Sequence, residues 1–114
     1  MAITSEIIGK LGGAEVEVTP VSVPSLSGSS SSKLLHTVNI PPGETWLVAV
    51  AGTGTAGSGT SNGMPRINIG GVSVRQSTGH FASAAVMTES GDVILESNSS
   101  GTTSFEGNIY AVKM

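Results

Sequence analysis

Two histidines are the residues of this chain best suited to binding a metal. His36 and His80 are the only histidines in the 114 residues, and the chain has no cysteine. A zinc site needs four ligands, usually drawn from Cys, His, Asp and Glu. His36 lies in a strand-like segment and His80 in a polar, turn-like one, and no spacing of acidic residues supplies the missing ligands. We therefore expect neither a metal site nor a cofactor.

Three acidic residues, Glu89, Asp92 and Glu96, cluster around one predicted turn. Two carboxylates held close together can hydrolyse a glycoside, and several carboxylate oxygens can bind calcium. Charged residues in a turn are more often simply solvated, and we prefer that interpretation. The one Gly-x-Ser-x-Gly match, at residues 59–63, lies in a glycine-rich stretch with no helix pattern after it, so it is not the strand-to-helix elbow of a serine nucleophile. These observations predict a protein without catalytic residues, which is not an enzyme.

The charged and aromatic residues bear on the choice of macromolecular partners. The five cations are scattered and form no basic cluster of the kind that binds nucleic acid. Glycan-binding surfaces usually present exposed aromatic rings, but the chain has only four aromatic residues and a core would use most of them. No apolar run approaches the length of a membrane span, and residues 1–11 do not resemble a secretory signal. We expect no nucleic-acid binding and no membrane insertion, while glycan binding stays open.

The composition predicts one small domain with an aliphatic core. Hydrophobic residues make up 38% of the chain and aromatic residues 4%, so Val, Ile, Leu and Ala must fill the interior. Charged residues make up only 11%, and the net charge is −3. A surface with so few charges is either covered by other subunits or made soluble by Ser, Thr and Asn side chains.

The central stretch of the chain, residues 34–51, reads as a β-hairpin. The first predicted strand has a two-residue period that places four residues on its inner face, Leu34, His36, Val38 and Ile40. Pro41-Pro42-Gly43 predicts a turn, because proline lacks an amide donor and glycine permits positive φ. Trp46, Val48 and Val50 then form the inner face of a second strand. We expect these three residues to be structural core, with the single tryptophan buried.

Two later segments carry strong strand patterns. Residues 66–75 form a predicted hairpin in which two isoleucines pair with two valines across Gly70-Gly71. Residues 81–88 are apolar on both parities, which is typical of a strand covered on both faces.

Shorter patterns complete the predicted fold. Residues 93–95 and 104–114 read as strands, with Gly107 marking a bulge, and residues 52–63 read as a long glycine-rich loop. The resulting seven or eight short strands, separated by turn signals, predict an all-β, antiparallel β-sandwich or jelly-roll-like domain.

The N-terminal segment shows a different period. An apolar stripe at helical spacing consists of Ile3, Ile7, Ile8 and Leu11. It predicts a short helical arm that ends at Gly12-Gly13. A helix this short is marginal alone, so its stripe must rest on another surface. That surface is either the sheet of the same chain or a neighbouring subunit, and we predict docking on a neighbouring chain or on a larger particle.

The segment after the arm reads as a connection to the domain. Residues 14–23 alternate like a strand, but Pro20 and Pro24 predict that it is short and lies at a sheet edge. Residues 25–32 are rich in Ser and read as a flexible tether. The predicted organisation is an arm and tether over residues 1–32 and a β-sandwich domain over residues 33–114.

Several segments resemble small minor tail proteins of mycobacteriophage-like tailed phages, which infect actinobacteria. The first thirteen residues, from Met1 to Gly13, carry one part of the resemblance. The segments Leu35-His36-Thr37-Val38 to Pro42-Gly43-Glu44-Thr45-Trp46, Pro65-Arg66-Ile67-Asn68-Ile69 and Tyr110-Ala111-Val112-Lys113-Met114 carry the rest. The Pro-Gly-Glu-Thr element also occurs in many phage fibre and capsid-decorating β-domains.

The resemblance implies a non-enzymatic structural protein of the phage virion, made in the host cytoplasm. We expect a tail-associated protein that contacts other virion proteins through its N-terminal arm, with the β-domain facing outward. We also expect a homo-oligomer, most simply a trimer. The alternatives are a capsid decoration protein on the phage head and a module that binds a host receptor or surface glycan.

Overall fold

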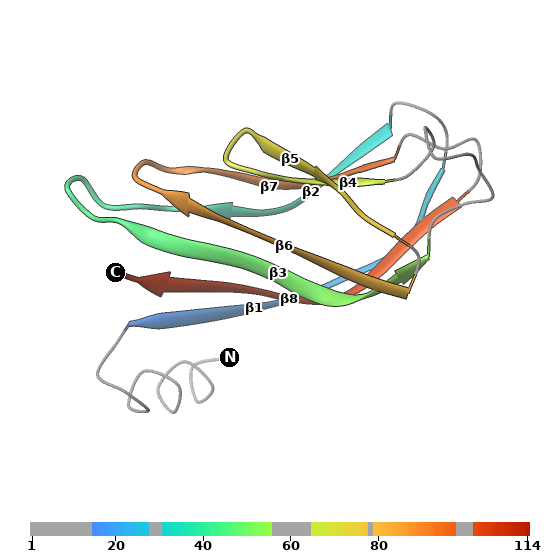
Figure 1. Cartoon of the computed structure of the whole chain (residues 1–114), viewed down its shortest axis with the longest axis horizontal. Coiled ribbons are helices and arrows are strands. Elements are labelled where there is room, and N and C mark those ends of the chain that lie inside the picture. Colours follow the sequence, from blue (N-terminus) through green and yellow to red (C-terminus); the bar gives the residue numbers. More distant parts are fainter. Residues whose placement is uncertain (1–14, 28–30, 56–64, 78, 98–101) are drawn as a thin grey trace.

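The computed structural model describes residues 15–27, 31–55, 65–77, 79–97 and 102–114, and every regular element in these ranges is a β-strand (Figure 1). The predicted helical arm lies outside the described residues. The strands are β1 Val16–Ser27, β2 Ser31–Val38, β3 Trp46–Thr55, β4 Arg66–Ile69, β5 Val72–Arg75, β6 Gly79–Met87, β7 Gly91–Ser97 and β8 Thr102–Lys113.

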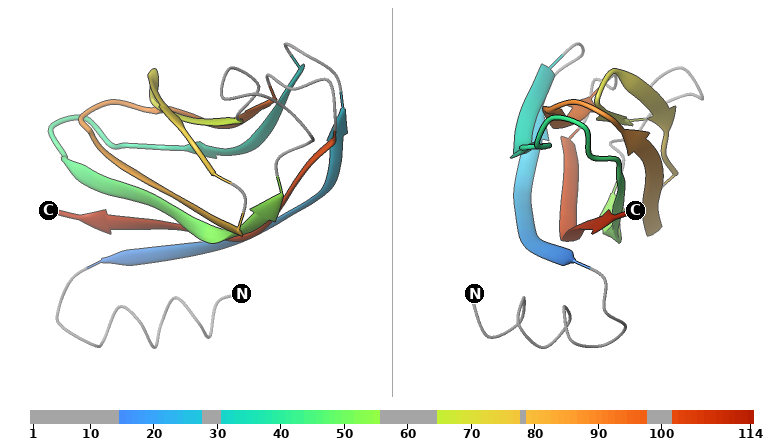
Figure 2. Two further views of the ribbon diagram at one scale, coloured as in Figure 1. Left: turned by 45° about the vertical axis from the view of Figure 1, so that its right-hand side comes forward. Right: turned by 90° about the vertical axis from the view of Figure 1, so that its left-hand side faces the viewer.

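The strands form two antiparallel sheets of four, which confirms the prediction of an all-β sandwich. The first sheet, sheet A, has the order β1-β8-β3-β6, and the second, sheet B, has the order β2-β7-β4-β5. Every strand pairs with its counterpart from the other end of the chain: β1 with β8, β2 with β7, β3 with β6 and β4 with β5. Figure 2 shows the two sheets facing each other, with strands β1 and β8 bending strongly along their length.

The core lies between the two sheets and is built from alternate residues of the strands. In β3 the side chains of Trp46, Val48 and Val50 are buried, while Leu47 is exposed on the other face. The largest fully buried side chains are Phe81, Phe105, Ile67, Ile69, Leu95, Ile109, Val48, Val50 and Val93. Both sheets therefore contribute their inner faces to one largely aliphatic core that also contains two phenylalanines and Trp46.

Residues 34–51 do not form the predicted hairpin, because β2 belongs to sheet B and β3 to sheet A. The predicted turn is present: the amide of Glu44 donates to the carbonyl of Pro41 at 3.1 Å, and Gly43 has φ +82°. It lies within a link that crosses from one sheet to the other. Ile40 in this link is buried, and its amide donates to the Ser90 hydroxyl at 2.8 Å. A buried link anchored in this way carries the chain between the layers.

Leu34 faces solvent, contrary to the prediction that it faces inward. The pairing of β2 with β7 shifts register between Leu34 and His36, which is a bulge that accommodates one extra residue. Because side chains alternate with a period of two, one extra residue reverses the face of everything before it. Leu34 is 54% exposed, and Leu35 packs against the core instead.

Strand β1 lies at a sheet edge, as predicted, but it is longer than expected. It pairs with β8 from Val16 to Ser27, with a register shift between Val23 and Leu26. Pro20 is tolerated because an edge strand needs hydrogen bonds on one side only. Residues 16–27 are thus part of sheet A, although the sequence placed them in the arm and tether. Of the predicted tether, residues 28–30 lie outside the described part of the chain.

Two glycine predictions also need correction. Strand β3 continues through Gly52 to Thr55, where a loop was expected, and only residues 56–63 of that loop lie outside the description. Gly107 pairs directly with Gly52 in continuous register, so it does not mark a bulge. A Cβ atom on Gly52 would overlap the backbone of Glu106 and Gly107. These two glycines let β3 and β8 approach closely.

Strand β6 is the second edge of sheet A and is covered on one face only. Phe81 and Met87 are buried, but Ala82, Ala84 and Val86 on the other face are exposed. The prediction that both faces are covered is therefore wrong for the described chain, and an apolar outer face remains.

Candidate functional site

Asp92 and Glu96, two of the three acids that cluster in the sequence, are held apart on strand β7. Asp92 and Glu96 are four residues apart on the same face of β7, or about 13 Å along an extended strand. Paired carboxylates in glycoside hydrolases lie within about 10 Å of each other. Both carboxylates instead accept a hydrogen bond from another strand of sheet B: Thr37 Oγ1 on β2 donates to Asp92, and Ser73 Oγ on β5 donates to Glu96, both at 2.9 Å. These carboxylates connect strands of sheet B.

The two histidines belong to different sheets. His36 lies on β2 in sheet B, and His80 lies on β6 in sheet A, where it pairs with Thr53 of β3. Across the part of the chain that the structure describes, no group of three His, Asp or Glu side chains could hold a metal ion.

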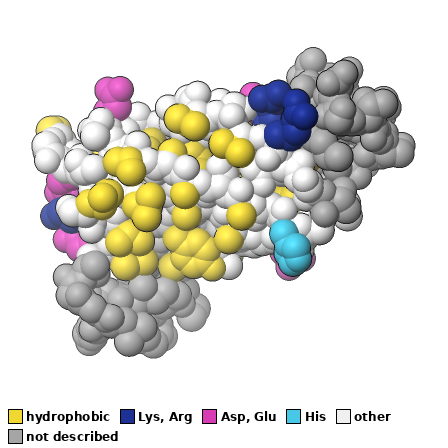
Figure 3. All heavy atoms as spheres, viewed as in Figure 1, with side chains coloured by type: hydrophobic (Ala, Val, Ile, Leu, Met, Phe, Trp, Pro, Cys, Tyr) yellow, Lys and Arg dark blue, Asp and Glu magenta, His cyan; other side chains and the backbone are white. Residues whose placement is uncertain are grey.

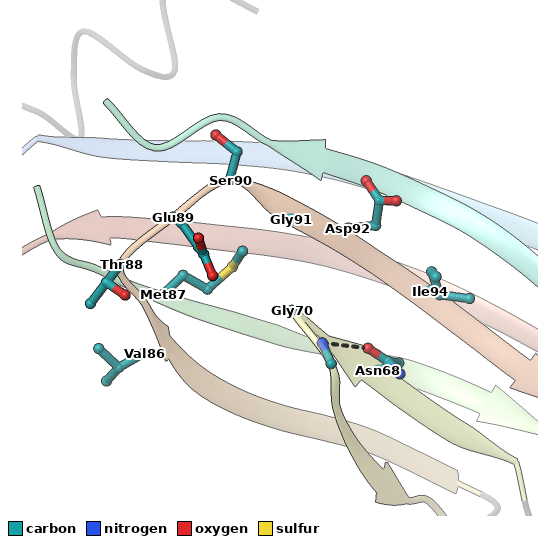
Figure 4. Close-up of a pocket in the computed structure, with 11 residues that line it drawn as sticks. Asn68, Gly70, Val86, Met87, Thr88, Glu89, Ser90, Gly91, Asp92 and Ile94 are labelled. Carbon is teal, nitrogen blue, oxygen red and sulfur yellow. Dashed lines mark hydrogen bonds between the residues drawn. The ribbon is translucent and has the colours of Figure 1, made fainter. Parts of the chain in front are cut away.

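A pocket of about 410 Å³ opens between the β6–β7 turn and the β4–β5 hairpin (Figure 4). The buried side chain of Met87 projects into this region toward Gly70. The pocket is lined by Asn68, Gly70, Gly71, Val86, Met87, Thr88, Glu89, Ser90, Gly91, Asp92 and Ile94. It therefore has two acidic side chains and, among these lining residues, no basic one.

The polar groups of this pocket hold the strands together. Ser90 Oγ accepts the amide of Ile40 at 2.8 Å, and Asn68 Oδ1 accepts the amide of Gly71 at 2.9 Å. The amide of Gly70 donates to the carbonyl of Asp92 at 3.0 Å. The Ser90 hydroxyl is thus engaged by the β2–β3 link, since it accepts from the amide of Ile40 and donates to its carbonyl. The pocket is a structural junction.

The outer face of sheet A offers a more distinctive feature. The strand register places Leu47 of β3 between Val86 of β6 and Val112 of β8. One pair further along, Ala49 lies between Ala84 and Tyr110. We call this surface, which extends onto β1, the apolar patch; it consists of Val16, Val18, Leu47, Ala49, Ala84, Val86, Tyr110 and Val112. Figure 3 shows hydrophobic side chains gathered over the strands of sheet A.

The apolar patch spans all four strands of sheet A but only one end of it. Leu47 is 38% exposed and Val86 is 56% exposed. Further along the strands the same outer face becomes polar, with Thr53, Thr55 and Ser104 around a second pocket of about 380 Å³. Thr55 and Ser104 share a hydrogen bond of 2.7 Å. The patch thus lies at the end of the sheet where β1 begins and β8 ends (Figure 1).

The predicted core residues lie next to this end of the sheet. Trp46 is 5% exposed, and its indole Nε1 donates to Glu44 Oε1 at 2.9 Å. The other oxygen of Glu44 lies 3.5 Å from Lys113 Nζ. The predicted arm-docking residues lie outside the described residues; they are Ile3, Ile7, Ile8 and Leu11.

Sequence reasoning missed the apolar patch, although a signal for it was present. In residues 46–51, Trp46, Val48 and Val50 define the inner face of the predicted strand. Leu47 and Ala49, which alternate with them, are also apolar. Residues 81–88 have the same double-sided pattern, which predicts a strand covered on both faces. Two adjacent strands that carry apolar residues at both odd and even positions indicate an apolar outer face on the sheet.

The described part of the chain contains no helix long and apolar enough to cross a membrane. Comparisons with protein-family models, with curated proteins and with solved structures give no match.

Proposed function

We propose that this protein is a non-enzymatic structural component of a phage virion, associated with the tail. Its N-terminal arm and the apolar patch join it to neighbouring virion proteins, and the rest of the β-domain faces outward. In the particle it is a homo-oligomer, most simply a trimer. The observation that carries the proposal is the apolar patch, because it is a surface suited to being covered by protein.

The physical case rests on the composition of the patch. Its eight residues come from all four strands of sheet A and include no charged side chain. Monomeric proteins rarely expose contiguous apolar surface of large extent, and such surface marks interaction sites. Only 11% of the residues are charged, so the surface has few charges to keep the protein soluble if the patch is uncovered.

The strand order provides a second line of support. The strands form four antiparallel pairs that are nested in the sequence, with β1 and β8 the outermost pair and β4 and β5 the innermost. These pairs, rolled into two sheets, form a jelly roll. Jelly rolls occur in viral capsid domains and also in lectins and cupins, so the architecture alone does not choose a function. The two histidines lie on different sheets, and Asp92 and Glu96 are engaged in hydrogen bonds between strands, which favours a structural role over catalysis. The resemblance to minor tail proteins then favours the tail.

The test is incorporation of charged variants into particles of the phage whose genome encodes the chain. Leu47→Glu and Val86→Glu place a carboxylate in the apolar patch. Thr53→Glu is the matched control, because it adds the same group to the polar part of the same strand and face. Mass spectrometry of gradient-purified particles should find the unmodified chain and the control at a fixed copy number, with both patch variants strongly depleted.

Two results would count against the proposal in different ways. Absence of the unmodified chain from purified particles would refute the virion role itself. Incorporation of both patch variants at the normal copy number would show that the chain is attached through another surface.

A further inference from the structure

The apolar patch has dimensions that suit one short helix. Four strands spaced about 4.8 Å apart give a width of about 14 Å from β1 to β6. Along the strands the patch covers little more than the rows through Leu47 and Ala49, before the face becomes polar at Thr53. A helix is about 10 Å in diameter with its side chains, so a single helix lying across the strands would cover this area.

The chain itself contains a segment that matches this surface. Residues 3–11, if helical as their period predicts, would be about 13 Å long, close to the width of the four strands. Their apolar stripe consists of Ile3, Ile7, Ile8 and Leu11. The charged residues of the segment, Glu6 and Lys10, do not belong to this stripe and would face solvent.

The place where the described chain begins favours this segment over any other occupant. The description starts at Glu15, and the next residue, Val16, is already part of the apolar patch. Only residues 12–15 separate the stripe from the patch, a span of at most about 14 Å when fully extended. Gly12 and Gly13 in this link permit the backbone conformations that a reversal of direction needs.

We infer that, in the free protein, the apolar stripe of residues 1–14 docks on the apolar patch of the same chain. A short link gives the stripe an effective concentration in the millimolar range at its own patch, which a second copy in dilute solution does not reach. This contact goes beyond the proposed function, since it does not require a virion. Transfer of the arm to a neighbouring virion protein during assembly would rest on that function.

Cysteine cross-linking tests the contact, because the natural chain has no cysteine. The full-length double variant Ile7→Cys/Ala49→Cys places one thiol in the stripe and one in the patch. The control is Ile7→Cys/Thr53→Cys, whose second thiol lies on the same strand and face but in the polar part. Under mild oxidation, non-reducing electrophoresis and peptide mapping should show an intrachain disulfide in the first variant and little in the control.

Three outcomes of the cross-linking would overturn the inference. These are no disulfide in the first variant, equal disulfide formation in both variants, and disulfides only between chains. Interchain disulfides would mean that the arm docks on another copy. None of these outcomes bears on whether the protein is present in virions, which is measured separately by particle composition.

A second measurement avoids cysteines and keeps the inference testable if a cysteine variant does not fold. Binding of anilinonaphthalene sulfonate reports exposed hydrophobic surface. The full-length variant Ile7→Asp/Ile8→Asp should bind severalfold more dye than the unmodified protein, because its stripe no longer covers the patch. The control Ser5→Asp/Gly9→Asp adds the same charge outside the stripe and should leave dye binding unchanged. Equal dye binding by the unmodified protein and the stripe variant would contradict the inference.

Discussion

The rings of Phe81 and Phe105 stack in the core with their centroids 5.7 Å apart and their planes inclined by 15°. They come from β6 and β8, which are not neighbours in sheet A, because β3 lies between them. At this level β3 carries Gly52, which pairs with Phe81, and Gly54, which pairs with Phe105. The two rings meet above a strand that has no side chains there.

Substitution of Gly54 should therefore disturb the aromatic pair. A Cβ atom at this position would lie 2.9 Å from the ring of Phe81. We expect Gly54→Ala to lower the free energy of unfolding by about 1–3 kcal/mol, the usual cost of overpacking. Thr53→Ala, on the exposed face of the same strand, should change it by less than about 0.5 kcal/mol. Urea unfolding measures both, and a Gly54→Ala protein as stable as the control would show that the space is not limiting.

Truncation of Trp46 should be among the most costly changes in the domain. The side chain is 5% exposed, and its indole N–H is bonded to Glu44. Trp46→Ala should lower the free energy of unfolding by about 3–5 kcal/mol, since it creates a large cavity. The folded protein should also show the blue-shifted fluorescence of a buried indole. Emission typical of an indole in water, from a protein that is otherwise folded, would be incompatible with this structure.

The β4–β5 hairpin offers a separate test of backbone conformation. Gly70 and Gly71 have φ values of +57° and +97°, and a Cβ atom on Gly71 would meet no other atom. Any cost of substitution at Gly71 is therefore conformational rather than steric. Gly71→Val should lower the free energy of unfolding by about 1–2 kcal/mol, whereas Gly71→Asn should be much milder, because asparagine tolerates positive φ. Equal effects of the two substitutions in thermal unfolding would argue against this turn geometry.

The sequence was sufficient for local features of the fold. The hairpin across Gly70 and Gly71 was predicted correctly because its pairing joins residues close in the chain and its turn has a distinct glycine signal. The inward positions of Trp46, Val48 and Val50 follow from the same two-residue period. The turn at Pro41-Pro42-Gly43 was also found.

The remaining features of the fold could not be predicted, because they depend on strand pairing and register between segments far apart in the chain. Nothing near residues 34–51 shows that the first strand pairs with β7 and the second with β6 and β8, rather than the two with each other. The bulge beside Leu34 reverses its face without any glycine or proline to mark it. The apolar patch exists only because Leu47, Val86 and Val112, far apart in sequence, share one row of sheet A. The local pattern indicates an apolar outer face on each strand, but the row that joins the strands depends on their non-local register.

Electron microscopy of intact particles labelled with gold-coupled antibody against the domain tests the proposed virion role most directly. The account predicts label on the tail, at a constant number of sites per particle, and no label on particles from a phage lacking the gene. Label confined to the head would contradict the tail assignment. Absence of label from particles, with the protein present only in the soluble lysate, would contradict the virion role altogether.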